Sequence, residues 1–503
     1  MVGRTFLFLT LMAACAFLLV MAADIESDSV LSHERQLLVI TEPGNRRRVR
    51  RKAGGDAAPP LGEGDLALFR GGLTRSELTK LHDGYVDRML AKYAEAEGFP
   101  PPLAGYLKKN RDVGEVFVTA IDPFYDDICA AARVFDDLRL ADENRLEKYV
   151  HLATALAVVH DTPDAVLTSR YHSLWGVTRE QFSDPPKPRE VWDYYTDASS
   201  GSRFRFAIDK LPWPILVHLA DNDARGEDRE WSLSKYNAHS TEIVKLYYGV
   251  GCDNSKERGG TPQLGAKPYA LPNLLRYGGV CGDRAHFASR VAKCVGVPAM
   301  KVVGGGRSEG TGHTWMGFLA ARNGWTILDF TGNPCDDFYT GDVFDPQTHT
   351  LLLDRFLAMD YDGALRSYPR YIRSRMLVRM ARGVRPQRPR EAVALLREAL
   401  RTNPLGMWSW PLLMDFIKDG TVPRDEALPW ADRMLKALKD HPDMTFNCLG
   451  TFLDCIPEGD APGRESLLDR AEGLYGERPD LLNRLRLEYR QLAAAAPERP
   501  SGD

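Results

Sequence analysis

Apolar residues recur every three to four positions over most of this chain, which is the spacing of a helix with one buried face. One such run begins at the capping box Thr-Arg-Ser-Glu, residues 74–77. It places five apolar side chains on one face: Leu78, Leu81, Tyr85, Met89 and Tyr93. The same spacing continues through 122–138, 143–160 and 241–248. It predicts a mostly helical region over residues 63–250.

The pattern becomes mixed after this region. A helical run over 281–294 is followed by extended apolar segments. These segments are 298–303, 313–321 and 325–330. Asn323-Gly324 is a strong hairpin signal because both residues accept the positive φ of a tight turn. The glycine-rich stretch 304–312 predicts a flexible hairpin loop between the first two segments. We therefore predict an α+β fold in which the helix is followed by an antiparallel sheet.

The C-terminal part returns to helical spacing and shows a period. A helical run beginning at residue 390 ends at Asn403-Pro404, a similar ending occurs at Pro442, and another Pro follows at 479. Helix pairs with a period in the high thirties resemble tetratricopeptide repeats, which offer a concave face to peptides or partner proteins. We predict such a tetratricopeptide-like region over residues 365–497. The alternative is a helical cap on the preceding domain.

The N-terminus predicts export. Arg4 precedes an almost unbroken apolar run from residue 6 to 23, and Val20-Met21-Ala22 fits a small-residue cleavage site. We interpret residues 1–23 as a secretory signal peptide, which makes the mature chain periplasmic or secreted. If the signal is not cleaved, its apolar run of about 18 residues is just long enough to anchor the chain in a bilayer. No other segment is long and apolar enough to span a membrane.

Charge and low-complexity segments limit the possible partners. The net charge is −4, which argues against a nucleic-acid-binding protein. Residues 24–62 are polar, basic and then Pro/Gly-rich, so they predict a disordered linker. The basic run 46–52 within it predicts a solvated arm, with a processing site or an anionic-surface contact as alternatives. Residues 498–503 predict a disordered tail.

The candidate chemistry lies in the mixed region, as Cys281, His313 and Asp329 in that order. Cys281 follows Gly278-Gly279 and opens the predicted helix. A cysteine reacts as its thiolate, and a helix N-terminus with a neighbouring imidazole lowers its pKa from about 8.5. His313 opens one predicted strand and Asp329 closes the next, so a hairpin would bring the carboxylate beside the imidazole and orient it. The first amides of the helix would stabilise a thiolate or an oxyanion.

These residues resemble the transglutaminase-like superfamily of papain-type thiol enzymes. The resemblance is carried by GGVC at 278–281, GVPA at 296–299, HTW at 313–315 and GWTILDFT at 324–331. It implies a papain-like catalytic domain, with a nucleophile helix packed on an antiparallel sheet, over residues 251–364. It also implies that Cys281 is the nucleophile, His313 the base and acid, and Asp329 the orienting carboxylate.

The sequence departs from the family pattern at two places. Members often have Asp-Pro-Thr where this chain has Asp329-Phe330-Thr331. Eukaryotic transglutaminases carry Gln-Cys-Trp around the nucleophile, whereas here Val280 and Gly282 flank it. The side-chain half of the oxyanion hole is then unassigned, and Tyr277 is a candidate for it.

Two further positions are candidates for binding the substrate or the oxyanion. The first is Gly282, next to the nucleophile. The second is Trp315, which alternates with His313 on one strand face and would either line the acyl pocket or fill the core.

The predicted function is therefore an exported thiol enzyme that transfers or hydrolyses acyl groups at amide bonds of a protein or peptide substrate. It would be a cysteine peptidase or amidase, or a protein-glutamine acyltransferase. The alternative is a non-catalytic interaction scaffold built from the same domain and the helical repeats. We expect no cofactor and no metal, because the cysteines lack paired short spacings and no His-Glu-x-x-His occurs.

Eight cysteines are present, and seven would remain after signal cleavage. With Cys281 unpaired, the other six could form disulfides. The alternative is that they are ordinary buried thiols.

Overall fold

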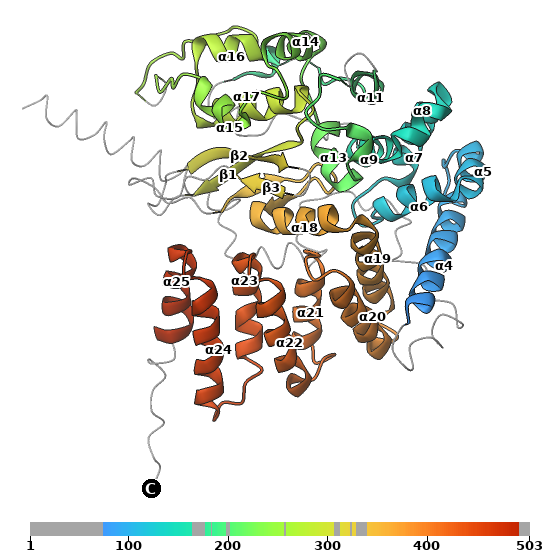
Figure 1. Cartoon of the computed structure of the whole chain (residues 1–503), viewed down its shortest axis with the longest axis vertical. Coiled ribbons are helices and arrows are strands. Elements are labelled where there is room, and N and C mark those ends of the chain that lie inside the picture. The colour runs from blue at the N-terminus through green and yellow to red at the C-terminus, as the bar shows by residue number, and fades with distance from the viewer. Residues whose placement is uncertain are drawn as a thin grey trace, which may run out of the picture.

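The computed structural model describes residues 74–162, 177–182, 184–197, 202–255, 258–305, 312–321, 324–327 and 340–491. The predicted signal peptide, the linker 24–62 and the tail 498–503 lie outside these ranges, as does Asp329. The fold is α+β, as predicted, with many helices and one antiparallel sheet (Figure 1).

Helices make up the described chain ahead of the sheet. They are α4 (Arg75–Ala94), α5 (Pro101–Lys109), α6 (Arg111–Ala120), α7 (Ile128–Ala141), α8 (Glu143–Lys148), α9 (Val150–Val159), α11 (Pro188–Thr196), α13 (Trp213–Ala220), α14 (Gly226–Lys235), α15 (Ile243–Gly249) and α16 (Leu271–Tyr277), with short 3₁₀ turns η2 (Arg179–Gln181) and η3 (Ile208–Lys210). The predicted capping box opens α4. Thr74 Oγ1 accepts from the Glu77 amide at 3.3 Å, and Glu77 Oε2 accepts from the Thr74 amide at 2.8 Å.

The helix α9 forms the buried centre of this helical region. Its sequence is apolar on nearly every side, and the eight residues from Leu152 to Val159 are all buried. A helix of this composition belongs in the interior of a protein. It packs accordingly against α6, α7, α11 and α13.

The sheet has five antiparallel strands in the order β3-β2-β1-β4-β5. They are β1 (Ala299–Gly305), β2 (Gly312–Ala321), β3 (Gly324–Ile327), β4 (Asp342–Phe344) and β5 (Leu351–Leu353). The first three are the predicted strands, and β2 and β3 form the predicted hairpin. The prediction that 304–312 is entirely loop was wrong at its ends, which extend β1 and β2. The strands β4 and β5 were not predicted, because three residues are too few to show alternation.

Two helices cover the sheet from opposite sides. The helix α17 (Cys281–Cys294) packs on β1 and β2, and α18 (Asp354–Arg366) packs on β3 and β5. Figure 1 shows α15 and α16 beside α17, on the side of the sheet away from α18. The strand β2 therefore lies beneath the helix that carries Cys281.

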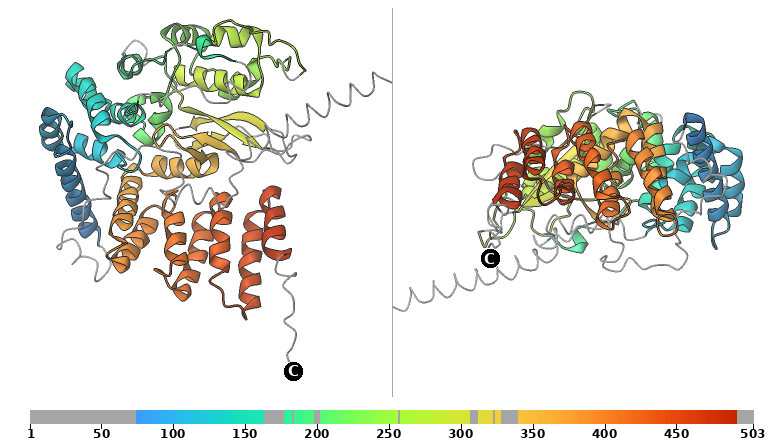
Figure 2. Two further views of the ribbon diagram at one scale, coloured as in Figure 1. Left: turned by 180° about the vertical axis from the view of Figure 1, so that it is seen from behind. Right: turned by 90° about the horizontal axis from the view of Figure 1, so that it is seen from below.

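The C-terminal part consists of helices that lie beyond α18 (Figures 1 and 2). They are α19 (Tyr368–Val384), α20 (Pro389–Thr402), α21 (Ser409–Lys418), α22 (Arg424–Ala437), α23 (Pro442–Leu453), α24 (Ala461–Leu474), α25 (Pro479–Leu485) and a π-helical turn, η4 (Arg486–Gln491). Neighbouring helices pack along the whole region: α19 on α20, α20 on α21, α21 and α22 on α23, α23 on α24, and α24 on α25. Pro442 and Pro479 open α23 and α25, at a position where a missing amide hydrogen is tolerated.

The helical regions and the sheet share one buried core, which contains side chains from Leu78 to Leu485. Polar contacts reinforce the junctions. Arg379 on α19 donates to the carbonyl oxygens of Thr119 and Ala120 at 2.9 and 3.2 Å. The Met407 amide donates to Asp360 on α18 at 3.1 Å. Within the described residues, no helix combines the length and apolarity needed to cross a membrane.

Candidate active site

A tight turn positions the start of α17. Gly278 has φ +76°, and a β-carbon there would lie 2.6 Å from the Gly251 carbonyl oxygen. The Gly279 amide donates to that oxygen at 3.0 Å. The Gly279 carbonyl oxygen accepts from the Asp253 amide, also at 3.0 Å. The chain therefore enters the helix through a turn fixed against residues 251–253. This is the close backbone approach that the paired glycines predict.

The carboxylate of Asp283 fixes the first turn of α17 from within. Its Oδ2 accepts from the Val280 amide at 2.9 Å, and its Oδ1 accepts from the Tyr269 hydroxyl at 2.6 Å. Burial raises the pKa of this carboxyl, and the two hydrogen bonds oppose that rise. The first helical bond runs from the Arg284 amide to the Val280 carbonyl at 3.1 Å. The amides of Cys281 and Gly282 lie ahead of it, where a helix does not supply an acceptor.

His313 lies near the start of β2, in register with Gly304 of β1. Its ring stacks on Trp315, with ring centroids 6.2 Å apart and planes inclined by 25°. Trp315 is only 1 % exposed, so in this structure it supports the imidazole from inside the core. A β-carbon at Gly304 would lie 2.3 Å from the Trp315 ring. Packing against Trp315 therefore requires a glycine at position 304. The sequence prediction had placed this glycine in a loop.

Sequence reasoning missed Tyr247, which lies between the nucleophile helix and the histidine strand. Its hydroxyl donates to the Thr314 carbonyl at 2.9 Å and lies 3.4 Å from His313 Nε2. Because its hydrogen points to the carbonyl, the phenol oxygen is left to accept from an Nε2–H group. Burial raises the pKa of Tyr247, and Cys281 raises it further.

Arg284 holds Tyr247 in this position. Its Nε donates to the Tyr247 carbonyl at 3.1 Å, and its guanidinium lies 4.6 Å from the centroid of the same ring. Arg284 belongs to the first turn of α17, so the helix that presents Cys281 also fixes the phenol beside His313. Tyr247 and Arg284 are 37 residues apart in the sequence. No local pattern of residues could therefore have predicted their contact.

Charged and titratable side chains also lie on and beside the nucleophile helix. Lys301 of β1 has its pKa lowered to about 8, chiefly by burial and by Arg290, whereas Cys281 and Asp283 are among the groups that raise it. A cation near a thiol favours the thiolate. His286 is buried beside Tyr269, with ring centroids 4.9 Å apart, and burial lowers its pKa.

The remaining predicted site residues occupy different positions. Tyr277 ends α16 and is half-buried, with the Lys267 ammonium 4.6 Å from its ring centroid. Gly282 is the second residue of α17 and is buried. Asp329 lies outside the described residues, so its role stays a prediction.

Six cysteines belong to the described residues, and no disulfide joins any two of them. Cys294, Cys448 and Cys455 are buried, and burial raises the pKa of each thiol. Cys281 is half-buried and Cys252 is exposed. In the same parts of the chain, no group of three or more His, Cys, Asp or Glu residues could hold a metal ion.

The arrangement can support nucleophilic chemistry. A thiol at a helix start and an imidazole that contacts a buried phenol are groups that can take part in such chemistry. No protein-family model, no curated protein and no solved structure matches this chain.

Proposed function

We propose that this chain is a thiol enzyme of the transglutaminase-like, papain-type kind that acts on amide bonds of proteins or peptides. The observation that carries the proposal is the position of Tyr247, whose hydroxyl lies 3.4 Å from His313 Nε2 and whose helix packs on the helix that begins at Cys281. The buried phenol contacts the imidazole that the sequence selects as base, beside the helix that carries the selected nucleophile.

The reaction would proceed in two steps. The Cys281 thiolate attacks the carbonyl carbon, and the resulting oxyanion is stabilised by amides at the start of α17, including that of Gly282. Protonated His313 gives its proton to the leaving amine as the C–N bond breaks, which leaves a thioester. His313 then takes a proton from water or an acceptor amine, which attacks the thioester and releases Cys281 as the thiolate. Asp329 would orient the imidazole throughout.

The acceptor defines the reaction type and requires a direct assay. A glutamine-containing peptide library is incubated with the mature chain, with and without an added primary amine, and analysed by mass spectrometry. Amine adducts would identify an acyltransferase, deamidated glutamine an amidase, and shortened peptides a peptidase. The Cys281→Ala variant should give none of these products. If the wild-type chain also gives none, and its Cys281 is no more reactive than its other thiols, the interaction scaffold becomes the better reading.

Export belongs to the same proposal, because an extracytoplasmic thiol enzyme would carry the signal peptide read at residues 1–23. The mature chain would then begin near Ala23 or Asp24.

Removing the Tyr247 hydroxyl should have an effect of intermediate size on catalysis. Tyr247→Phe should lower kcat/KM about threefold to tenfold, because a typical hydrogen bond contributes about 0.5–1.5 kcal/mol. The pH profile of Cys281 alkylation should shift as well, since the phenol contacts His313. Tyr248→Phe is the matched control, because the adjacent Tyr248 is 54 % exposed. Equal profiles for the two variants would show that Tyr247 has only a packing role.

A further inference from the structure

Three large apolar side chains are exposed on one face of the sheet, and we call them the sheet patch: Val303 on β1, Phe344 on β4 and Leu351 on β5. Their exposed fractions are 36 %, 49 % and 49 %. Phe344 and Leu351 are direct partners in the register, and Val303 is paired with Asp342, two positions before Phe344. Partners across an antiparallel pair share a face, as do residues two apart on one strand. The three side chains therefore project from the same face.

The centre of the sheet patch is fixed before anything binds to it. The Phe344 ring stacks on His349, with ring centroids 6.0 Å apart and planes inclined by 8°. His349 lies in the turn between β4 and β5 and has φ +52°, a conformation that residues with a side chain rarely adopt. Its amide donates to the Asp345 carbonyl at 3.0 Å. The turn thus holds an imidazole against the phenyl ring, so little order must be imposed on binding.

The sheet patch begins near the start of α17. Only residues 295–298 connect the end of α17 to the start of β1, and the helix packs on the strand. Both elements are about 20 Å long, so the start of the helix lies near the far end of β1. Tyr247 joins the same two places. Its carbonyl accepts from Arg284 in the first turn of α17, and its hydroxyl donates to the carbonyl of Thr314, the register partner of Val303.

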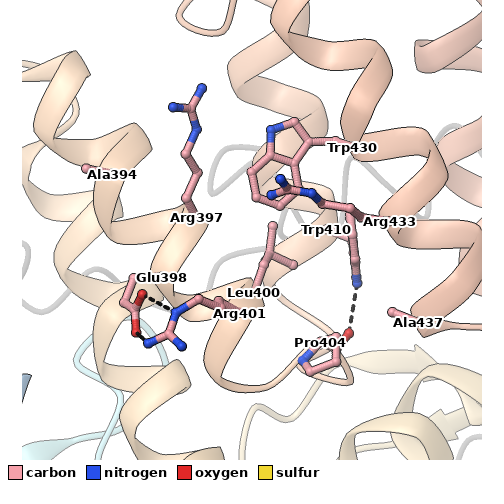
Figure 3. Close-up of a pocket in the computed structure, with 10 residues that line it drawn as sticks. All are labelled: Ala394, Arg397, Glu398, Leu400, Arg401, Pro404, Trp410, Trp430, Arg433 and Ala437. Atoms are coloured by element: carbon pink, nitrogen blue, oxygen red, sulfur yellow. Dashed lines mark hydrogen bonds and ion pairs between the residues drawn. The ribbon is translucent and has the colours of Figure 1, made fainter. Parts of the chain in front are cut away.

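Exposed apolar side chains concentrate around this helix. Eight large apolar residues are exposed in the described parts of the chain; three form the sheet patch, and two, Val244 and Tyr248, lie on α15, which packs on α17. Apolar patches on a soluble protein often mark binding surfaces. A cavity of about 650 Å³ between α20, α21 and α22 (Figure 3) offers a less accessible apolar surface, because Leu400, Trp410 and Trp430 in its lining are buried.

We propose that the sheet patch binds apolar side chains of the substrate polypeptide beside the amide bond that Cys281 attacks. The inference rests on the proposed function, because it takes the bound polypeptide to be the substrate. An extended segment places every second side chain on one side, about 7 Å apart, which suits a patch that spans the roughly 10 Å from β1 to β5. The substrate class is then a protein or peptide with two apolar residues, two positions apart, near the reacting amide.

The size of the sheet patch favours a substrate segment over a second copy of the chain. A whole aromatic side chain buries about 150–250 Å², so three side chains that are less than half exposed provide less than about 400 Å². A stable dimer buries about 800 Å² on each partner. The patch is therefore large enough for a few substrate side chains and too small by itself for a stable dimer.

Binding is measured on the full mature chain with Cys281→Ala, so that no peptide is consumed. The probe is the fluorescein-labelled peptide Leu-Ser-Leu-Ser-Gln-Ser-Leu-Ser-Leu, whose leucines flank the glutamine on both sides. The matched peptide carries Asn in place of each Leu. Fluorescence anisotropy should show saturable binding of the leucine peptide and at least about tenfold weaker binding of the asparagine peptide, because burying about two methylene groups already gives a factor of ten.

Two substitutions in the sheet patch test its role directly. Phe344→Ser and Leu351→Ser should each weaken binding of the leucine peptide about fivefold to tenfold and leave the asparagine peptide unchanged. Leu140→Ser is the matched control, because Leu140 is exposed on α7, away from the sheet (Figure 1). Equal affinity for the two peptides, no binding of either, an equal effect of Leu140→Ser, or a dimer in analytical ultracentrifugation that Phe344→Ser dissociates would each overturn the proposal.

A second measurement separates the sheet patch from the proposed chemistry. In the chain that retains Cys281, Phe344→Ser should lower kcat/KM for the leucine peptide about as much as it lowers affinity. The same variant should leave the rate of iodoacetamide alkylation of Cys281 unchanged. An unreactive Cys281 in the wild-type chain would contradict the proposed function, whereas turnover of the leucine and asparagine peptides with equal kcat/KM would contradict the sheet patch alone.

Discussion

Replacing Cys281 by alanine should lower turnover by about 10⁴-fold or more, because no other group can provide the thiolate that forms the thioester. The fold should persist, since Cys281 is half-buried at the first position of α17 and alanine is well suited to a helix. Turnover of the best library peptide, with circular dichroism of both proteins, measures the two expectations together.

Cys252→Ala is the control for this variant. Cys252 is exposed and forms a backbone bridge with Gly279, two residues before the nucleophile. Its loss removes a thiol from the same neighbourhood but should leave turnover within about twofold, since its side chain has no part in the mechanism. A folded Cys281→Ala variant with wild-type turnover would refute the proposed chemistry, whatever Cys252→Ala does.

The second large effect concerns stability. Lys293, near the end of α17, is fully buried, and its ammonium lies 2.5 Å from Asp221 Oδ1. Tyr195 also donates to the Lys293 carbonyl at 3.0 Å. Asp221→Asn would leave the lysine without its carboxylate, and breaking a buried pair in this way costs about 3 kcal/mol or more. The free energy of unfolding in urea at neutral pH should fall by that amount.

The pH dependence of this loss has a definite sign. Burial lowers the pKa of Lys293 to about 8 in the folded chain, below its ordinary 10.5. The unfolded chain therefore binds more protons between these values, and this lysine's contribution to stability rises with pH there. Without Asp221, the pKa should fall further. The difference between variant and wild type should be largest near neutral pH and should shrink as the pH rises through about 8, where Lys293 loses its proton in the folded wild-type chain.

Asp221→Asn combined with Lys293→Met is the control. Lys293→Met removes the buried ammonium that Asp221→Asn leaves without a carboxylate, so the double variant should recover most of the lost stability. A double variant no more stable than Asp221→Asn would mean that the two side chains act independently, and the pair would not be the reason for the loss.

Short-range patterns allowed much of the central fold to be predicted. The helix α17 and the hairpin of β2 and β3 follow from helical spacing and from Asn323-Gly324, which are local signals. The capping box of α4 is local too, and both of its hydrogen bonds form. The strands β4 and β5 depend instead on pairing with β1 and with each other, which no three-residue pattern can encode.

In the candidate site, too, features with a local sequence signal could be predicted, whereas long-range contacts could not. The positions of Cys281 at a helix start and His313 on a strand follow from sequence. The contact of Tyr247 with His313 joins elements 66 residues apart. Arg284 reaches Tyr247 across 37 residues. Such contacts arise from how α15 packs on α17, which apolar spacing does not specify. The carboxylate role of Asp329 remains a prediction from sequence.

The proposed chemistry requires that Cys281 reacts as a thiolate and that His313 assists it. The most direct measurement is the rate of iodoacetamide alkylation of each cysteine near pH 6, resolved by mass spectrometry of the digested protein. Cys252 is the internal reference, because it is more exposed and access therefore favours it. An ordinary thiol with a pKa of about 8.5 is almost entirely protonated at that pH.

We expect Cys281 to be alkylated at least about tenfold faster than Cys252, because the thiolate is the species that reacts. The His313→Ala variant should lose this excess while the labelling of Cys252 stays the same. Equal slow labelling of both cysteines in the wild-type chain, or an excess that survives in His313→Ala, would contradict the account.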